Sequence, residues 1–384
     1  MTVSISGRTA LRGLVLVSAL LMSSASFAAS DAKKVADDIV ALLKAKGDQN
    51  VTYGAATAAG DVVTISDFKL SSGKEGEITI PAIVVTAPVD RQPGGFTATS
   101  IAFDNGQFLK GDNTAKWATG IVNDAIVPAP SEVEAKAKLT PFSHFGIGSI
   151  TATNKKDQVE PVTIASFAID LSNVVDGTPN DGKLQITGIA IPQAVIATEA
   201  QAKATLDQLG YTSLLLNVAI DGGYDEAKQS ATIRQIEVDG KDMGKLTITG
   251  SFGGLTREKL QSTDAMKNVA STATLENASV RFENAGIAEK LLDMQAKSMG
   301  ATRDSLAMML PAALPLAFSQ LNITDEAFQS KVVGAVTAFL KDPKSFTVSL
   351  KPATPVLLES LGQQAMASPS SIPSLLAIDV QANN

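Results

Sequence analysis

The chain has 384 residues, a net charge of −7, no cysteine, and a hydrophobic fraction of 45%. The lack of cysteine excludes disulfide bonds and thiol chemistry. The acidic balance, with basic residues clustered only in pairs such as Lys33-Lys34, argues against nucleic acid as a partner, because nucleic acid binding depends on clustered Lys and Arg.

An apolar run near the start of the chain predicts export. Arg8 and Arg12 precede "GLVLVSALLM", and the small residues "SSASFA" follow it. This is the layout of a secretory signal peptide, with cleavage after Ala28, and about ten apolar residues are too few for a membrane-spanning helix. We therefore expect residues 1–28 to be removed, which changes the net charge from −7 to −9, and the rest to be a soluble periplasmic protein without a transmembrane segment.

The first element of the remaining chain is predicted to be a helix. In "DAKKVADDIVALLKAK" (31–46), apolar residues recur at helical spacing on one face, and we expect that face to pack against a sheet. Ser30 can cap the start of this helix, and Gly47 can end it.

Strand patterns dominate the next two hundred residues. The runs "DVVTISDFKL", "GEITIPAIVV" and "FTATSIAFDN" between 51 and 110 alternate or are β-branched, and Gly, Pro, Ser and Lys separate them. We expect further strands at 147–153, 162–171, 183–191 and 212–221. Between these groups, we expect helices near 114–125 and at 131–138.

A pair of short motifs recurs in these strands. The copies are "TISDF" with Gly76 and "ITI" (78–80), "TIRQI" with Gly244 and "LTI" (246–248), and a looser copy, "TIASF" with Gly182 and "LQI" (184–186). The distance from Thr to Gly is 12 residues in the first two copies. These motifs predict repeated hairpins.

Two matching hexapeptides follow the first two of these copies. "SIAFDN" (100–105) comes after the first, and "SVRFEN" (279–284) comes after the copy at 232–248. We interpret them as equivalent strand ends in a duplicated sheet, because Phe alternates with a β-branched residue in each. The alternative is a pair of acid–Asn sites that bind a metal or a sugar.

Helices return after residue 285. The predicted helices are 286–299, 303–321 with Thr302 as its cap, and 326–341 with Thr324 and Asp325 as its cap. A strand, "SFTVSLKP" (345–352), and a Pro- and Ser-rich tail follow.

These elements predict an α+β fold, an extended, curved antiparallel sheet built from repeated hairpins and covered by N-terminal and C-terminal helices. The expected division is a signal peptide at 1–28, the first helix and strand repeat at 29–140, the second and third repeats at 141–285, and a helical cover with a final strand and tail at 286–384.

The most apolar stretch after residue 28 is "LAMMLPAALPLAF" (306–318). One interpretation is a buried helix kinked at Pro311 and Pro315. The other is an adaptable apolar groove, since Met side chains repack around varied partners. The groove hypothesis assigns ligand binding to Met308, Met309, Leu314, Phe318, Phe328 and Phe339.

Catalytic and metal-binding patterns are weak. His144 is the one histidine, which excludes two-His metal sites, and we expect a structural or surface role for it. "GTPNDGKL" (177–184) nearly matches a phosphate-binding loop, but Leu184 replaces the hydroxyl residue that would bind Mg²⁺, and we expect a hairpin turn instead. We assign no catalytic residue, no metal and no cofactor.

Two segments resemble a group of uncharacterised exported proteins of proteobacteria. They are "LGYTSLLLNVAIDGGYDEAKQSATIRQIEVDGKDMGKLTITGSF" and "FLKDPKSFTVSLKPATPV". The resemblance implies a periplasmic location and carries no activity.

The sequence thus favours a periplasmic, non-catalytic binding protein, a carrier or chaperone for a lipid or another apolar envelope ligand. One alternative is a protein–protein module in envelope assembly. The other is a hydrolase that acts on an envelope polymer.

Overall fold

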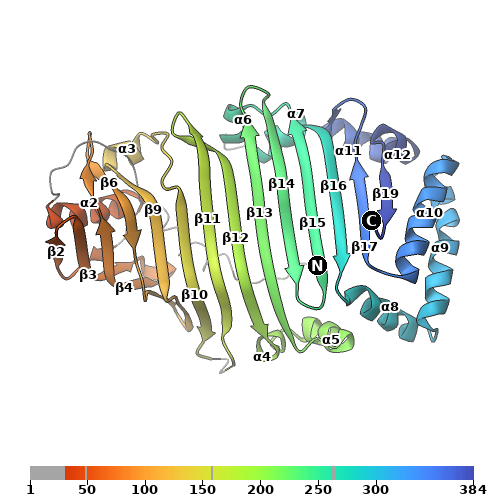
Figure 1. Ribbon diagram of the computed structural model, residues 1–384, viewed down its shortest axis with the longest axis horizontal. Helices are drawn as coiled ribbons and strands as arrows, with labels where there is room; N and C mark the ends of the chain where they lie inside the picture. The colour runs from red at the N-terminus through yellow and green to blue at the C-terminus, as the bar shows by residue number, and fades with distance from the viewer. Residues whose placement is uncertain (1–30, 48–49, 157–158, 262–264) are drawn as a thin grey trace. The chain divides into compact units, whose positions relative to one another are not determined.

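A computed structural model describes residues 31–47, 50–156, 159–261 and 265–384 (Figure 1). The predicted signal peptide lies outside these residues. The chain divides into two compact units, unit 1 up to Thr198 and unit 2 from Glu199 onward. Each unit combines an antiparallel sheet with helices, so the predicted α+β class is confirmed. The boundaries predicted at 140 and 285 stay a prediction.

The elements of unit 1 run from a helix into a series of strands. In chain order they are α2 (Ala32–Ala45), β1 (Asn50–Thr52), β2 (Ala56–Ala59), β3 (Val62–Ser71), η1 (Gly73–Glu75), β4 (Glu77–Thr86), β5 (Val89–Asp90), β6 (Gly95–Ala102), β7 (Gln107–Lys110), β8 (Asn113–Lys116), β9 (Thr119–Pro128), α3 (Pro130–Glu134), β10 (His144–Asn154), β11 (Val162–Val175), β12 (Thr178–Pro192) and α4 (Gln193–Ile196).

The sheet of unit 1 is antiparallel throughout its described pairs. β3 pairs with β1 and β2 on one side and with β4 on the other. β4 then pairs with both β6 and β7, which share one position in the sheet, and β10 pairs in the same way with β8 and β9. β11 and β12 follow β10.

Helix α2 packs on part of this sheet, and its buried residues belong to the main core of unit 1. Its predicted apolar face is confirmed, because Val35, Ile39 and Leu42 are at most 1% exposed. The cap is Asp31, whose carboxylate accepts from the N–H of Lys33 at 2.9 Å. The core extends to Phe103, which stacks on Phe145 at 5.9 Å between ring centroids.

The elements of unit 2 are strands followed by a helical group and a second set of strands. In chain order they are α5 (Ala200–Leu209), β13 (Ser213–Asp225), β14 (Ser230–Gly240), β15 (Gly244–Gly253), α6 (Arg257–Gln261), α7 (Ala265–Thr272), β16 (Thr274–Asn284), α8 (Ile287–Ser298), α9 (Arg303–Gln320), α10 (Glu326–Lys341), β17 (Ser345–Leu350), β18 (Val356–Leu357), α11 (Leu358–Ala367), η2 (Pro369–Ser371), α12 (Ile372–Leu375) and β19 (Asp379–Ala382).

The strands of unit 2 pair in the order β13, β14, β15, β16, β17, β19, with β18 also on β16. Helix α10 packs on β19 and on α9, and α9 packs on α8 (Figure 1). The predicted caps are confirmed at Thr302, which accepts from the N–H of Ser305, and at Asp325, which accepts from the N–H of Phe328.

The repeated hairpins are confirmed by the strand register. The last residue of the first motif lies opposite the last residue of the second motif in all three copies. These pairs are Phe68 with Ile80 in β3–β4, Phe167 with Ile186 in β11–β12, and Ile236 with Ile248 in β14–β15.

The two hexapeptides, however, are not equivalent. Leu246 of the second copy lies opposite Phe282, but the matching Ile78 of the first copy lies opposite Phe108, five residues beyond Phe103. "SIAFDN" (100–105) begins in β6 and continues into the short turn that joins β6 to β7. Both strands pair with β4, so the hexapeptide does not lie at the end of that position in the sheet. The likeness of the hexapeptides therefore reflects local strand pattern and does not mark a shared place in the sheet.

Two other expectations are corrected. The helix predicted near 114–125 is instead strands β8 and β9, and burial alternates along β9 because a core lies on one of its faces. The tail predicted after residue 352 contains α11, α12 and β19. Within the described ranges, no helix combines the length and the apolar character needed to cross a membrane.

Candidate functional site

The sheet of unit 2 has one apolar face and one polar face. Along each strand successive side chains point to opposite faces, and residues paired across strands point to the same face. One cross-strand row contains Val218, Val238, Leu246, Phe282 and Phe346, and the next contains Ile220, Ile236, Ile248, Val280 and Val348. Both rows belong to the same face because they lie two residues apart.

Helices cover only part of this apolar face. Phe339 of α10 packs against Phe282 and Phe346, at 6.3 and 5.5 Å between ring centroids. Residues of α11 and α12 pack against Leu275 and the end of the face near it.

The remaining apolar residues lie on β13 to β16 and are at least partly open to solvent. We call them the open apolar face: Val218, Ile220, Ile236, Val238, Leu246, Ile248 and Val280. The exposed fractions are 43% for Ile220, 41% for Val238, 39% for Leu246 and 42% for Val280. Four neighbouring strands each contribute one of these exposed side chains, so the apolar residues form a patch rather than isolated surface positions.

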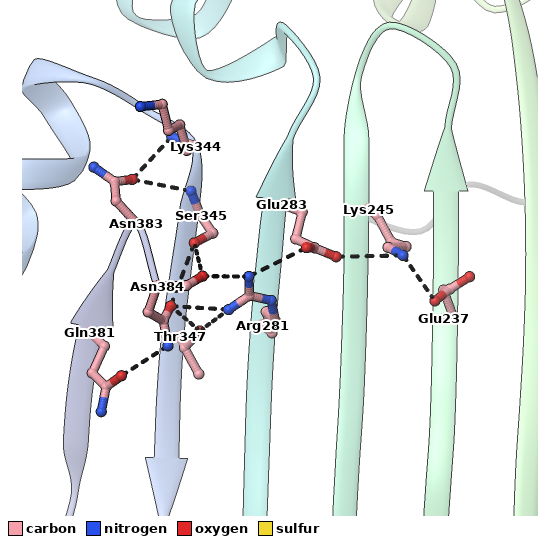
Figure 2. A network of polar contacts seen from close by, with 10 residues as sticks. All are labelled: Glu237, Lys245, Arg281, Glu283, Lys344, Ser345, Thr347, Gln381, Asn383 and Asn384. Carbon is pink, nitrogen blue, oxygen red and sulfur yellow. Dashed lines mark hydrogen bonds and ion pairs between the residues drawn. The ribbon is translucent and has the colours of Figure 1, made fainter.

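The opposite face carries a continuous polar network (Figure 2). Lys245 on β15 lies between Glu237 and Glu283, with Nζ–Oε2 distances of 3.7 and 3.4 Å. Arg281 on β16 donates to Glu283 at 3.3 Å and to Thr347 Oγ1 at 3.1 Å. Opposite charges therefore alternate across β14, β15 and β16.

The segment just after β19 joins this network. Arg281 also donates to the side chain and the backbone oxygen of Asn384, at 3.0 and 2.8 Å. Burial acts to raise the pKa of Glu283, but the hydrogen bond from Arg281 and the charges of Lys245 and Arg281 outweigh it and hold the pKa below the ordinary glutamate value. The polar face is thus satisfied by its own partners and suits contact with water.

The six residues of the groove hypothesis do not meet in one cavity. Phe318 is 7% exposed and packs on Phe328 at 6.4 Å between ring centroids, while Phe339 packs on the sheet. Met308 and Met309, also on α9, are 71% and 44% exposed. Leu314 on the same helix is half-buried. Helix α9 is therefore not the buried helix of the first interpretation, although it contains both prolines.

Of these six residues, Met308 lines a cavity of about 600 Å³ among α8, α9 and α10. The cavity has an apolar part formed by residues such as Leu292 and Leu340. The charged residues in its lining carry both signs: Glu289, Arg303, Asp304, Lys341 and Asp342. This lining does not favour one ligand class.

His144 forms a close pair with Asp170, in which Nδ1 lies 2.6 Å from Oδ1. The neighbouring Ser143 donates to Asp124 instead. Because each side chain has its own carboxylate partner, Ser143 and His144 do not form a nucleophile–base pair.

Of the near match to a phosphate-binding loop (177–184), only Gly177 lies in a hairpin turn, and the rest belongs to β12. Asp176 and Gly177 have φ values of 49° and 68° between paired Val175 and Thr178, which is the geometry of a two-residue hairpin loop. The part of the chain that the structure describes contains no group of three or more acidic or His side chains able to hold a metal ion.

Sequence reasoning missed the residues of the open apolar face. A signal was present, because β14 and β15 place apolar residues at every second position, as in "IEVDG" and "LTITG". The pattern shows which face is apolar, but it does not show which part of that face the helices leave open.

Comparison with known proteins gives limited information on function. A family model described as an uncharacterized protein matches residues 237–383, which run from β14 to β19 in unit 2. A search of curated proteins found no match to the chain.

Proposed function

We propose that this protein is a non-catalytic carrier, exported to the periplasm, that holds the apolar chain of a lipid or a similar envelope ligand on the open apolar face. The observation that carries the proposal is the set of four exposed side chains on neighbouring strands, Ile220, Val238, Leu246 and Val280. Residues 1–28, with the pattern of a signal peptide, support the periplasmic location.

The shape of the face supports an elongated apolar ligand. From β13 to β16 it spans three strand spacings, about 14 Å. Strands β14 and β15 each pair with a neighbouring strand on both sides. The patch therefore offers side-chain contacts and few free backbone groups. Each methylene buried there contributes about 0.8 kcal/mol before the cost of association.

The test is native mass spectrometry of the protein purified from periplasm without detergent, together with titration of a fluorescent fatty acid. The variant Leu246→Asp places a charge on the open apolar face. The matched control is Thr247→Asp, which places the same charge on the polar face opposite Arg281. Circular dichroism and thermal unfolding check that both variants fold.

We expect the wild type and Thr247→Asp to carry a lipid-mass adduct and to take up the fatty acid, and Leu246→Asp to lose both. Loss of the hydrophobic contact and burial of a carboxylate should weaken binding by about tenfold or more. A clean protein mass with no fatty-acid uptake by the wild type would refute the carrier.

A further inference from the structure

The first turn of α8 bounds one end of the open apolar face. The next cross-strand row beyond that of Leu246 contains Leu216, Gly240, Gly244 and Asn284. This row belongs to the apolar side of the sheet, because it lies two residues from its neighbour along each strand. The side-chain oxygen of Asn284 accepts from the N–H groups of Gly286 and Ala288, at 3.1 and 3.0 Å. The start of α8 therefore lies on the apolar side of the sheet.

Lys290 in this turn supplies a cation at the same end. Its Nζ lies 3.5 Å from the centroid of the Tyr211 ring, which attracts an ammonium group to its face. The Tyr211 hydroxyl donates at 2.7 Å to the backbone oxygen of Asp242, in the turn between β14 and β15. These two contacts hold the ammonium group beside the end of the two central strands of the open apolar face.

The charge of Lys290 is not paired with an acid. Within the described residues its ammonium group has no carboxylate partner, and the contact with Tyr211 is with a neutral ring. The neighbouring Glu289 is held elsewhere, because its carboxylate accepts from the side-chain amide of Asn284 at 2.7 Å. A ring face occupies one side of an ammonium group that has three donors. The half-buried Lys290 can therefore still donate to an anion.

The open apolar face leads away from this cation along the strands. Neighbouring rows are two residues apart, about 6.6 Å. The row of Ile220 therefore lies about 13 Å from the row of Leu216, and the row of Leu246 between them is apolar on all four strands from β13 to β16. A ligand with an apolar chain along the strands and an acidic group at one end matches both features.

We propose that Lys290 binds the headgroup of the ligand on the open apolar face, and that this ligand is a lipid with an anionic headgroup, a carboxylate or a phosphate. A lysine binds either group as a point charge, through charge-assisted hydrogen bonds. This role rests on the proposed carrier function and adds the class of lipid that the carrier selects. A neutral lipid with the same chain gains no such bond and binds more weakly.

The test is titration of the mature protein with a fluorescent fatty acid and with its methyl ester, which keeps the chain and removes the charge. The variant Lys290→Met removes the cation, and Lys290→Arg retains it. The matched control is Lys297→Met, on the same helix but about 10 Å further along its axis. Thermal unfolding checks that each variant folds.

We expect the wild type, Lys290→Arg and Lys297→Met to bind the fatty acid about tenfold more tightly than the ester. Lys290→Met should bind the two equally, because its affinity for the acid falls to that for the ester. Inorganic phosphate at the concentration of the fatty acid should displace none of it, since the site also needs the apolar chain. Full displacement by phosphate would overturn the assignment to a lipid headgroup in favour of a free anion.

Two further results would overturn the role of Lys290. One is a wild type that binds the acid and the ester with equal affinity, and the other is a Lys290→Met variant that keeps the preference of the wild type. Both leave the carrier function standing, because the ester still binds. A wild type that binds neither ligand refutes the carrier and the role of Lys290 together.

Discussion

At the scale of single residues, Arg91 and Glu132 in unit 1 form a largely buried ion pair. Their side chains are 5% and 13% exposed, and the two guanidinium nitrogens Nη1 and Nη2 donate to the two carboxylate oxygens at 2.7 and 2.9 Å. The same carboxylate accepts from the N–H of Ala129 at 2.9 Å. The pair thus joins the loop before β6 to the start of α3.

Removal of one partner leaves the other charge buried. We expect Glu132→Gln to lower the free energy of unfolding by about 3 kcal/mol, measured by urea denaturation at neutral pH. The double variant Arg91→Met, Glu132→Met should lose less, because it leaves no unpaired charge. A double variant whose free energy of unfolding is no higher than that of Glu132→Gln contradicts this account.

The same pair predicts a pH dependence. The hydrogen bond from Arg91, with that from Ala129, outweighs burial and holds the pKa of Glu132 below its ordinary value of 4.5. A carboxyl whose pKa is lowered by folding stabilises the fold above the unfolded pKa and loses that contribution as pH falls through the folded pKa. The stability difference between the wild type and Glu132→Gln should therefore shrink on acidification below pH 4.5. A constant difference across that range would show that the charge of Glu132 is not its cause.

At the scale of elements, the repeated hairpins share one steric constraint. Gly76 and Gly244 have φ values of 114° and 145°. A Cβ at Gly76 would lie 2.6 Å from the backbone oxygen of Leu109 and 2.8 Å from the Phe108 ring. A Cβ at Gly244 would lie 2.5 Å from the backbone oxygen of Glu283 and 2.9 Å from the Phe282 ring. The two copies therefore need glycine for the same reason.

We expect Gly244→Ala to lower the free energy of unfolding by about 1–3 kcal/mol, because both the backbone conformation and the contact are unfavourable. The control is Gly334→Ala in α10, where a Cβ meets nothing within 4 Å. That change should raise the free energy by about 0.5–1 kcal/mol. Urea denaturation measures the change in the free energy of unfolding for both variants. A change of the same sign in the two variants would rule out the steric explanation.

At the scale of the whole molecule, a ligand that binds only the folded protein must stabilise it. A fatty acid at about 100 times its Kd should add about 2.7 kcal/mol to the free energy of unfolding. We expect Tm to rise in the wild type and in Thr247→Asp, and to rise clearly less in Leu246→Asp, whose weaker binding leaves it at a lower multiple of its own Kd. An equal rise in all three proteins would place the ligand away from the open apolar face.

The local elements were largely determined by the sequence itself. The spacing of Val35, Ile39 and Leu42 predicted α2, and the motifs at 64–80, 163–186 and 232–248 predicted three hairpins, which the observed strand pairing confirms. These features depend on neighbouring residues, because helix and strand periods are set within a few positions of the chain.

The placement of side chains was decided by the tertiary structure. The segment 114–125 contains Trp117 and Val122, which are buried because they meet a core that distant strands complete, so it became strands. Phe108 rather than Phe103 occupies the place of Phe282, because pairing with β4 runs on through the turn at the end of β6.

The candidate site depended on the tertiary structure most of all. The sequence made Met308 and Phe318 look alike, yet one is 71% and the other 7% exposed. An apolar pattern states only that a residue can be buried, and the exposed fraction depends on which other element reaches it. The sequence therefore determined that unit 2 has an apolar sheet face, and only the positions of α10, α11 and α12 decided that its part on β13 to β16 stays open.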